Sequence, residues 1–211
     1  PGVDVASAIY AEGSLQVSDS AFTNLTSLSN GAAIRVDEYL GNTTIITDSS
    51  FESNESGLSG AAVWTNNNTL VNESTFKSNS TPNSGGAIYS EGGVILTIES
   101  STFELNEALN GGAIYNSDLN SIMRINNSTF VENSAINAAA ISLSEGSVIR
   151  NSTFWNNTGF PNQDATVSVS LDGGYSLFGN ILANSIDTEP VLATGGYSDH
   201  GANLFTGDSF V

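Results

Sequence analysis

The amino-acid sequence predicts an all-β protein, a right-handed parallel β-helix (solenoid) of about seven rungs with about 26 residues in each. Two short motifs recur along most of the chain and hold the same period. A period of about 20 to 50 residues indicates a solenoid, a propeller or an array of repeats. Because the repeating segments are short, β-branched and bounded by Gly, Asn and Ser, they are predicted to be strands, stacked in parallel along one axis.

The first motif reads small-small-Ala-aliphatic. Its aliphatic residue falls at positions 9, 34, 63, 88, 114, 141 and 167, in steps of 25 to 29 residues. Glycine opens the motif in four copies, as in Gly60-Ala61-Ala62-Val63, and is expected to supply a sharp turn with an unusual φ. If the aliphatic side chain points inward, the residue after it points outward and forms a column along the rod.

The second motif reads Ser-Ser/Thr-Phe-x-x-Asn, with degenerate copies at Phe22 and at Ile181 with Asn184. Its rings are expected to stack inside the rod, and its amides to form a ladder where the backbone turns. The predicted ring column consists of Phe51, Phe76, Phe103, Phe130 and Phe154. The predicted amide ladder consists of Asn54, Asn79, Asn106, Asn133 and Asn157.

The period covers residues 1–187 and is lost in residues 188–211. The sequence therefore predicts one domain of β-helix repeats at 1–187, followed at 188–211 by a C-terminal cap or the start of a next region. A cap is expected because the open last rung of a solenoid is an exposed strand edge.

Charge and composition exclude several classes of function. Asp and Glu number 22 against 4 Lys and Arg, which gives a net charge of −18. A field of this sign repels nucleic acid and anionic lipid, and no long apolar run is present, so we expect neither nucleic-acid binding nor membrane insertion by this segment. With no cysteine and a single histidine, His200, thiolate and imidazole chemistry have little material.

The alternation of Gly-Gly-Ala-Ile with Phe-x-x-Asn resembles the repeats of polymorphic outer-membrane proteins and related bacterial β-helix surface repeats. Gly85-Gly86-Ala87-Ile88 and Phe103 with Asn106 are representative copies, and the resemblance extends over about residues 1–187. It implies an extracellular, cell-surface right-handed β-helix, often an adhesin or a passenger region carried by a separate module. The chain departs from this family in lacking its frequent cysteines.

One acidic column is a candidate metal or catalytic site. Three residues before each Phe lie Asp19, Asp48 and Glu73, and stacked carboxylates could bind calcium or act as an acid and a base. The alternative is a plain turn position, because the column continues with Ser and Asn. Calcium is the one cofactor that the sequence suggests. A second set of acids, which we interpret as solvated surface, consists of Glu52, Glu55, Glu104 and Glu107.

One outward column is a candidate ligand-binding strip, formed by Tyr10, Trp64, Tyr89 and Tyr115. Such rings could stack sugars or dock a partner, or they could simply stack on one another as cross-strand pairs. The four cations are Arg35, Lys77, Arg124 and Arg150. They fall in different registers of the repeat, so no convergent basic cleft is expected, which disfavours chemistry on acidic sugars.

These observations predict an extracellular, cell-surface structural or adhesive stalk that is not an enzyme. Its partner would be a surface glycan or a protein receptor, or further copies of itself in a fibre. Two alternatives stay open. One is a carbohydrate-active β-helix enzyme of the polysaccharide lyase or epimerase type, with the acidic column in its cleft. The other is a filament-forming surface protein whose rods stack end to end.

Overall fold

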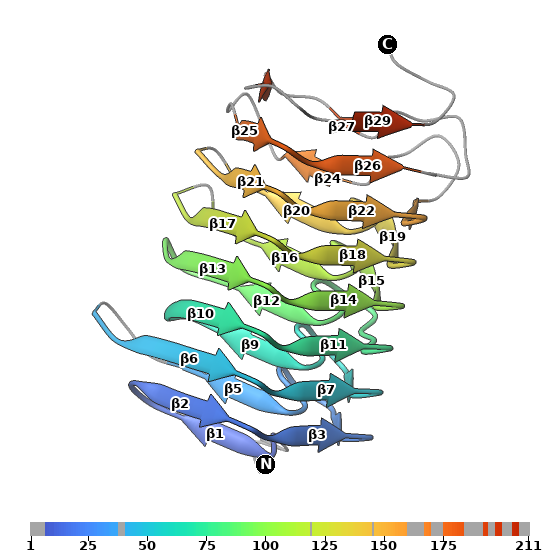
Figure 1. Ribbon diagram of the computed structural model, residues 1–211. Coiled ribbons are helices and arrows are strands. Elements are labelled where there is room, and N and C mark those ends of the chain that lie inside the picture. The colour runs from blue at the N-terminus through green and yellow to red at the C-terminus, as the bar shows by residue number, and fades with distance from the viewer. Residues whose placement is uncertain are drawn as a thin grey trace.

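The computed structural model describes residues 7–37, 41–118, 120–144, 146–159, 167–169, 175–183, 192–193, 197–199 and 204–206. The chain winds in successive coils that stack along one axis, and three long parallel sheets form its sides (Figure 1). None of these residues is helical, so the described part contains no helix that could cross a membrane. The predicted all-β parallel solenoid is confirmed.

Each coil contributes one strand to each of three sheets, here called A, B and C. Sheet A contains the Ala-aliphatic motif and consists of β1 (Ile9–Ala11), β5 (Ile34–Val36), β9 (Val63–Thr65), β12 (Ile88–Ser90), β16 (Ile114–Asn116), β20 (Ile141–Leu143), β24 (Val167–Val169) and β27 (Leu192–Ala193). Sheet B consists of β2 (Leu15–Ser18), β6 (Thr43–Thr47), β10 (Asn68–Asn72), β13 (Ile95–Glu99), β17 (Ile122–Asn126), β21 (Val148–Arg150), β25 (Tyr175–Phe178) and β28 (Tyr197–Asp199). Sheet C contains the Phe motif and consists of β3 (Ala21–Thr23), β7 (Ser50–Glu52), β11 (Thr75–Lys77), β14 (Thr102–Glu104), β18 (Thr129–Val131), β22 (Thr153–Trp155), β26 (Ile181–Ala183) and β29 (Leu204–Thr206).

A fourth edge of short strands follows sheet C in five of the described coils. It consists of β4 (Thr26–Ser27), β8 (Glu55–Ser56), β15 (Glu107–Asn110), β19 (Ser134–Asn137) and β23 (Thr158–Gly159). Single parallel bridges from Ser80 to Glu55 and to Glu107 connect β8 with β15. The coil therefore has a continuous fourth line of backbone pairing between sheets C and A.

The number of rungs and the last register differ from the sequence prediction. Each main sheet has eight strands where about seven were predicted, because β27, β28 and β29 come from the segment 188–211 and pair in parallel with β24, β25 and β26. In β26, Leu182 pairs with Phe154, while Ile181 pairs with Thr153. The degenerate Phe position is thus Leu182, and the expected ladder partner Asn184 lies outside the described residues.

Two left-handed corners flank the three-residue strands of sheet C. The first corner lies three residues before each Phe, with φ of 47–51° at Asp19, Asp48, Glu73, Ser100, Asn127 and Asn151. The second lies two residues after it, with φ of 52–56° at Asn24, Ser53, Ser78, Leu105, Glu132 and Asn156. Asn, Asp and Ser are common there because their short polar side chains bond locally and tolerate this backbone conformation. The corners make the chain turn sharply on both sides of the Phe.

The interior is a single apolar core built from columns of like residues. Six rings, from Phe22 to Phe154, stack with centroids 4.7–4.9 Å apart and planes within 6° of parallel. That spacing equals the separation of hydrogen-bonded strands, so the sheet itself sets the ring contact. Such pairs contribute about 0.5–1.5 kcal/mol each beyond the burial of their area.

The predicted asparagine ladder is confirmed, and each of its amides is buried. In each rung the backbone N–H and the side-chain Nδ2 of one Asn both donate to Oδ1 of the next, at 2.9–3.1 Å. The same Nδ2 also donates to the carbonyl of the Phe in the preceding rung, as Asn106 does to Phe76 at 3.0 Å. The ladder thus replaces sheet bonding at the second corner.

A serine ladder runs beside it at the first corner, and the sequence did not lead us to expect it. The backbone N–H of each serine two residues before Phe donates to Oγ of its counterpart in the next rung at 3.1–3.2 Å. Each Oγ donates in turn to a carbonyl two residues earlier in its own rung. Ser152 ends the series by donating from its backbone N–H to Oδ1 of Asn180 at 2.9 Å.

Candidate functional site

The aromatic strip lies on the outer face of sheet A. Strand register places Tyr10, Arg35, Trp64, Tyr89 and Tyr115 in one column. The rings of Trp64 and Tyr89 are stacked at 6.5 Å, and those of Tyr89 and Tyr115 at 5.7 Å. The Arg35 guanidinium carbon lies 5.2 Å from the Trp64 ring centroid, so a cation takes the place of a ring between Tyr10 and Trp64.

The middle of the strip is closed to ligands that stack on a ring face. Trp64 is only 7% exposed, whereas Tyr10 at the end is 45% exposed. The space beside the rings is also filled, since a Cβ on Gly60 would meet the Val63 carbonyl oxygen at 2.4 Å and the Tyr89 Cβ at 3.0 Å. This strip therefore stacks internally, and its exposed parts are the ring edges and Tyr10.

Tyr10 and Arg35 end the strip in a polar cluster. The Tyr10 hydroxyl donates to Glu12 Oε1 at 2.8 Å, and this bond is the main cause that raises the pKa of Tyr10 to about 12. Arg35 Nε donates to Asp37 Oδ1 at 2.7 Å. At neutral pH the end of the strip therefore carries the uncharged phenol of Tyr10 and the guanidinium of Arg35, whose charge is balanced by Asp37.

The acidic column Asp19, Asp48 and Glu73 lies on an exposed corner. All three residues have φ of 48°, and all three side chains are exposed. Within the described ranges, no group of three or more Asp, Glu, His or Cys side chains could hold a metal ion. The single histidine, His200, lies outside the described residues. Calcium binding at this column stays a prediction.

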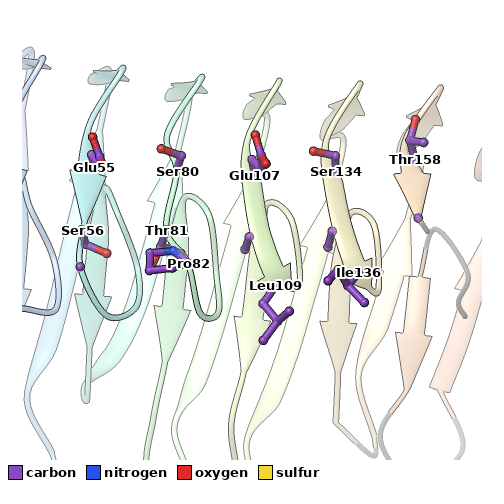
Figure 2. Close-up of a pocket in the computed structure, with 14 residues that line it drawn as sticks. Glu55, Ser56, Ser80, Thr81, Pro82, Glu107, Leu109, Ser134, Ile136 and Thr158 are labelled. Atoms are coloured by element: carbon purple, nitrogen blue, oxygen red, sulfur yellow. The ribbon is translucent and has the colours of Figure 1, made fainter.

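A groove runs along the fourth edge and crosses five rungs (Figure 2). Its volume is about 760 Å³. The first row of lining residues consists of Glu55, Ser80, Glu107, Ser134 and Thr158. The floor is formed by small residues, Ser56, Thr81, Ala108 and Ala135, and the far side by Pro82, Leu109 and Ile136. The groove thus has an acidic edge, a narrow floor of small side chains and an apolar edge.

Sequence reasoning did not find this groove. We interpreted Glu55 and Glu107 as solvated surface, and both are exposed, but they stand at the rim of a depression. The missed signal is an apolar residue six positions after Phe in several rungs, as at Leu109, which is 39% exposed. Repeated exposed apolar residues mark a contact surface more often than scattered ones do.

Comparison with known families gives a match for two segments of the chain. Residues 73–91 and 100–117 match the model of the Chlamydia polymorphic membrane protein repeat. Over these two segments the chain is similar to that repeat. Each matched segment contains one Phe-x-x-Asn motif and one Gly-Gly-Ala-Ile motif, which form sheets C and A of consecutive rungs. Searches of curated proteins and of solved structures gave no match.

The four cations do not all lie apart, contrary to the sequence prediction. Arg35 pairs with Asp37, and Lys77 pairs with Glu104 at 2.9 Å. Arg124 and Arg150, however, line one depression of about 400 Å³ on the outer face of sheet B. Their different positions in the repeat still bring them together, because they lie on adjacent strands and both point outward.

Proposed function

We propose that this repeat region is an extracellular, non-catalytic rod of a cell-surface protein, which adheres to a protein receptor through a lateral face. The match to polymorphic membrane protein repeats supports the surface location. The stacked rings and the two side-chain ladders support rigidity, because they satisfy corner groups that would otherwise cost about 1–3 kcal/mol each. The groove on the fourth edge is the single observation that carries the adhesive role.

The chemistry of the groove favours an extended polypeptide that carries basic and apolar side chains. Glu55 and Glu107 supply negative charge along one edge, and Leu109 and Ile136 supply apolar contact along the other. A second copy of this chain is a poor occupant, since two chains of charge −18 repel each other. Complementary charge steers association and sets specificity, whereas the apolar contacts contribute most of the affinity.

Adhesion of coated beads to cultured animal cells tests the function. We expect binding by the native chain, loss of binding after trypsin treatment of the cells, and no effect of periodate oxidation of their glycans. Leu109→Ser with Ile136→Ser should weaken binding about tenfold. The matched control is Leu105→Ser, which changes a leucine that is 43% exposed and does not line the groove.

Three results would contradict the proposal. Binding that survives trypsin but not periodate would assign the partner to a glycan, the other receptor class that the sequence suggested. Equal loss with Leu105→Ser would show that the groove is not involved. An increase of sedimentation coefficient with concentration, with no cell binding, would favour the filament-forming protein.

A further inference from the structure

Arg124 and Arg150 form a pair on the outer face of sheet B. Register pairs Arg124 with Val148 and Asn126 with Arg150, so the two arginines are diagonal neighbours on β17 and β21. Ile125 and Ile149 between them point into the core, which directs both guanidinium groups outward. Both arginines are exposed, and both line the same depression with Thr97 and Asn126.

These two charges have no carboxylate partner in the described part of the chain. Ion pairs there involve the other two cations, Arg35 and Lys77. Although the chain has 22 acids and 4 cations, these two adjacent cations have no ion-pair partner among the residues that the structure describes. Two adjacent like charges repel each other, and here no acid of the described surface pairs with either arginine to offset that repulsion. The arrangement creates a local positive site in a negative field.

The Arg150 side chain is also held in place. The Arg150 guanidinium carbon lies 4.8 Å from the centroid of the Phe178 ring. Stacking on an aromatic face restricts the guanidinium plane and leaves its N–H edge free to donate. Asn151 Nδ2 donates to Asn126 Oδ1 at 3.3 Å, which fixes the Asn126 amide at the border of the depression.

We propose that Arg124 and Arg150 bind the anionic group of an acidic saccharide. The planar fork of arginine matches a carboxylate or a sulfate through paired N–H donors. The net charge of −18 repels polyanions, so the ligand carries one acidic group among neutral ones. Thr97 and Asn126 offer neutral hydrogen-bonding groups for hydroxyls, and Val148 offers apolar contact. This site shares no residue with the groove and is independent of it.

Glu99 sharpens the proposal because it lines the same depression. It pairs with Asn126, which pairs with Arg150, so it stands in the Arg150 column two rungs away. Its carboxylate competes with an incoming anion for the guanidinium groups. Removing that charge should therefore strengthen binding, which a purely structural role of the arginines does not predict.

Titration calorimetry with small sugars tests the site in the intact chain. The probes are methyl glucuronide, a methyl glucoside sulfate and neutral methyl glucoside. We expect either anion to bind, with the preference between them identifying the acid, and the neutral sugar not to bind. Arg124→Gln and Arg150→Gln should each weaken binding about tenfold, and Glu99→Gln should tighten it. Lys77→Gln removes the same charge from sheet C and should change nothing.

The circular dichroism melting curves of the variants should coincide with that of the native chain, so that lost binding reports the site. Equal affinity for methyl glucoside would overturn the proposal. So would unchanged affinity in both arginine variants. Binding of N-acetyl-aspartate amide as tight as that of the glucuronide would also overturn it, because the site would then recognise an acidic peptide.

Discussion

The side-chain oxygen of Asn106 accepts two hydrogen bonds from Asn79, one from its backbone nitrogen and one from Nδ2, each at 3.0 Å. Asn106 is fully buried, and its own Nδ2 continues the ladder to Asn133. One residue thus satisfies groups in the rungs on both sides. Few polar side chains in a core are connected to this extent, and their removal leaves several donors without partners at once.

Replacement of Asn106 by Ala should therefore lower the free energy of unfolding by more than about 3 kcal/mol, because two buried donors of Asn79 lose their acceptor. Asn83→Ala is the control, since Asn83 is exposed. We expect it to stay within about 0.5 kcal/mol of the native chain in a urea titration. Similar losses in both variants would contradict a structural role for the ladder.

The ring column makes a second prediction about position along the rod. Phe103 lies between two stacked rings and is fully buried, so Phe103→Ala should cost about 3–5 kcal/mol in unfolding free energy. Phe22 is partly exposed and stacks on Phe51 at 4.9 Å, and Phe22→Ala should cost clearly less. Denaturant unfolding of both variants checks this order, and equal losses would argue against it.

Leu105 offers a stabilising substitution. It occupies the second left-handed corner with φ of 56°, where four of the other five rungs have Asn or Ser, and its side chain is 43% exposed. A left-handed conformation costs most non-glycine residues about 1–2 kcal/mol and asparagine less. Leu105→Asn should therefore raise stability by about 0.5–1 kcal/mol, measured by thermal unfolding. Leu28→Asn replaces another exposed leucine without positive φ and should have no such effect.

Tyr10 should ionise late in an alkaline titration. Its pKa is raised to about 12 because the phenol donates to Glu12 and because nearby acids disfavour a phenolate. Glu12→Gln removes one of these negative charges and should move the pKa down, towards the usual value near 10. The ultraviolet difference between each protein and its Tyr10→Phe variant isolates this group among six tyrosines. An unchanged pKa would rule out the hydrogen bond in solution.

Calcium binding by the acidic column is tested by thermal unfolding with and without a chelator. If Asp19, Asp48 and Glu73 bind calcium, EDTA should lower the melting temperature of the native chain. It should have no effect on a variant that carries Asp19→Asn, Asp48→Asn and Glu73→Gln. An equal melting temperature of the native chain in calcium and in EDTA would remove the hypothesis.

The sequence alone could predict the columns that depend on the repeat period and on the alternation of inward and outward side chains along a strand. Phe103 and Asn106 recur at a fixed step, and a fixed step in a solenoid is a column, so ring stacking and amide ladder followed directly. The serine ladder was equally periodic, but the partner of each Oγ depends on the backbone at the corner. Contacts between columns were harder: Arg124 and Arg150 occupy different repeat positions, and only the strand register shows them to be neighbours.

The groove was out of reach for a related reason. It lies between the Phe motif and the next Ala-aliphatic motif, outside both motifs, and its depth depends on the path of the folded backbone there. The burial of Trp64 similarly depends on how closely Arg35, Tyr89 and Gly31 approach its side chain. Such distances come from the folded backbone and not from any pattern of residue types.

The stacking of flat coils also determines what this architecture is good for. Each rung lengthens the molecule by about 4.8 Å, whereas the same 26 or so residues in an α-helix would span about 39 Å. A β-helix is therefore an inefficient fold for a protein that needs only to span a long distance. What the coil supplies is breadth: several side faces, each displaying a fixed lattice of side chains that new rungs can extend without disturbing the old ones. Duplication of a rung should thus enlarge a binding face in regular increments.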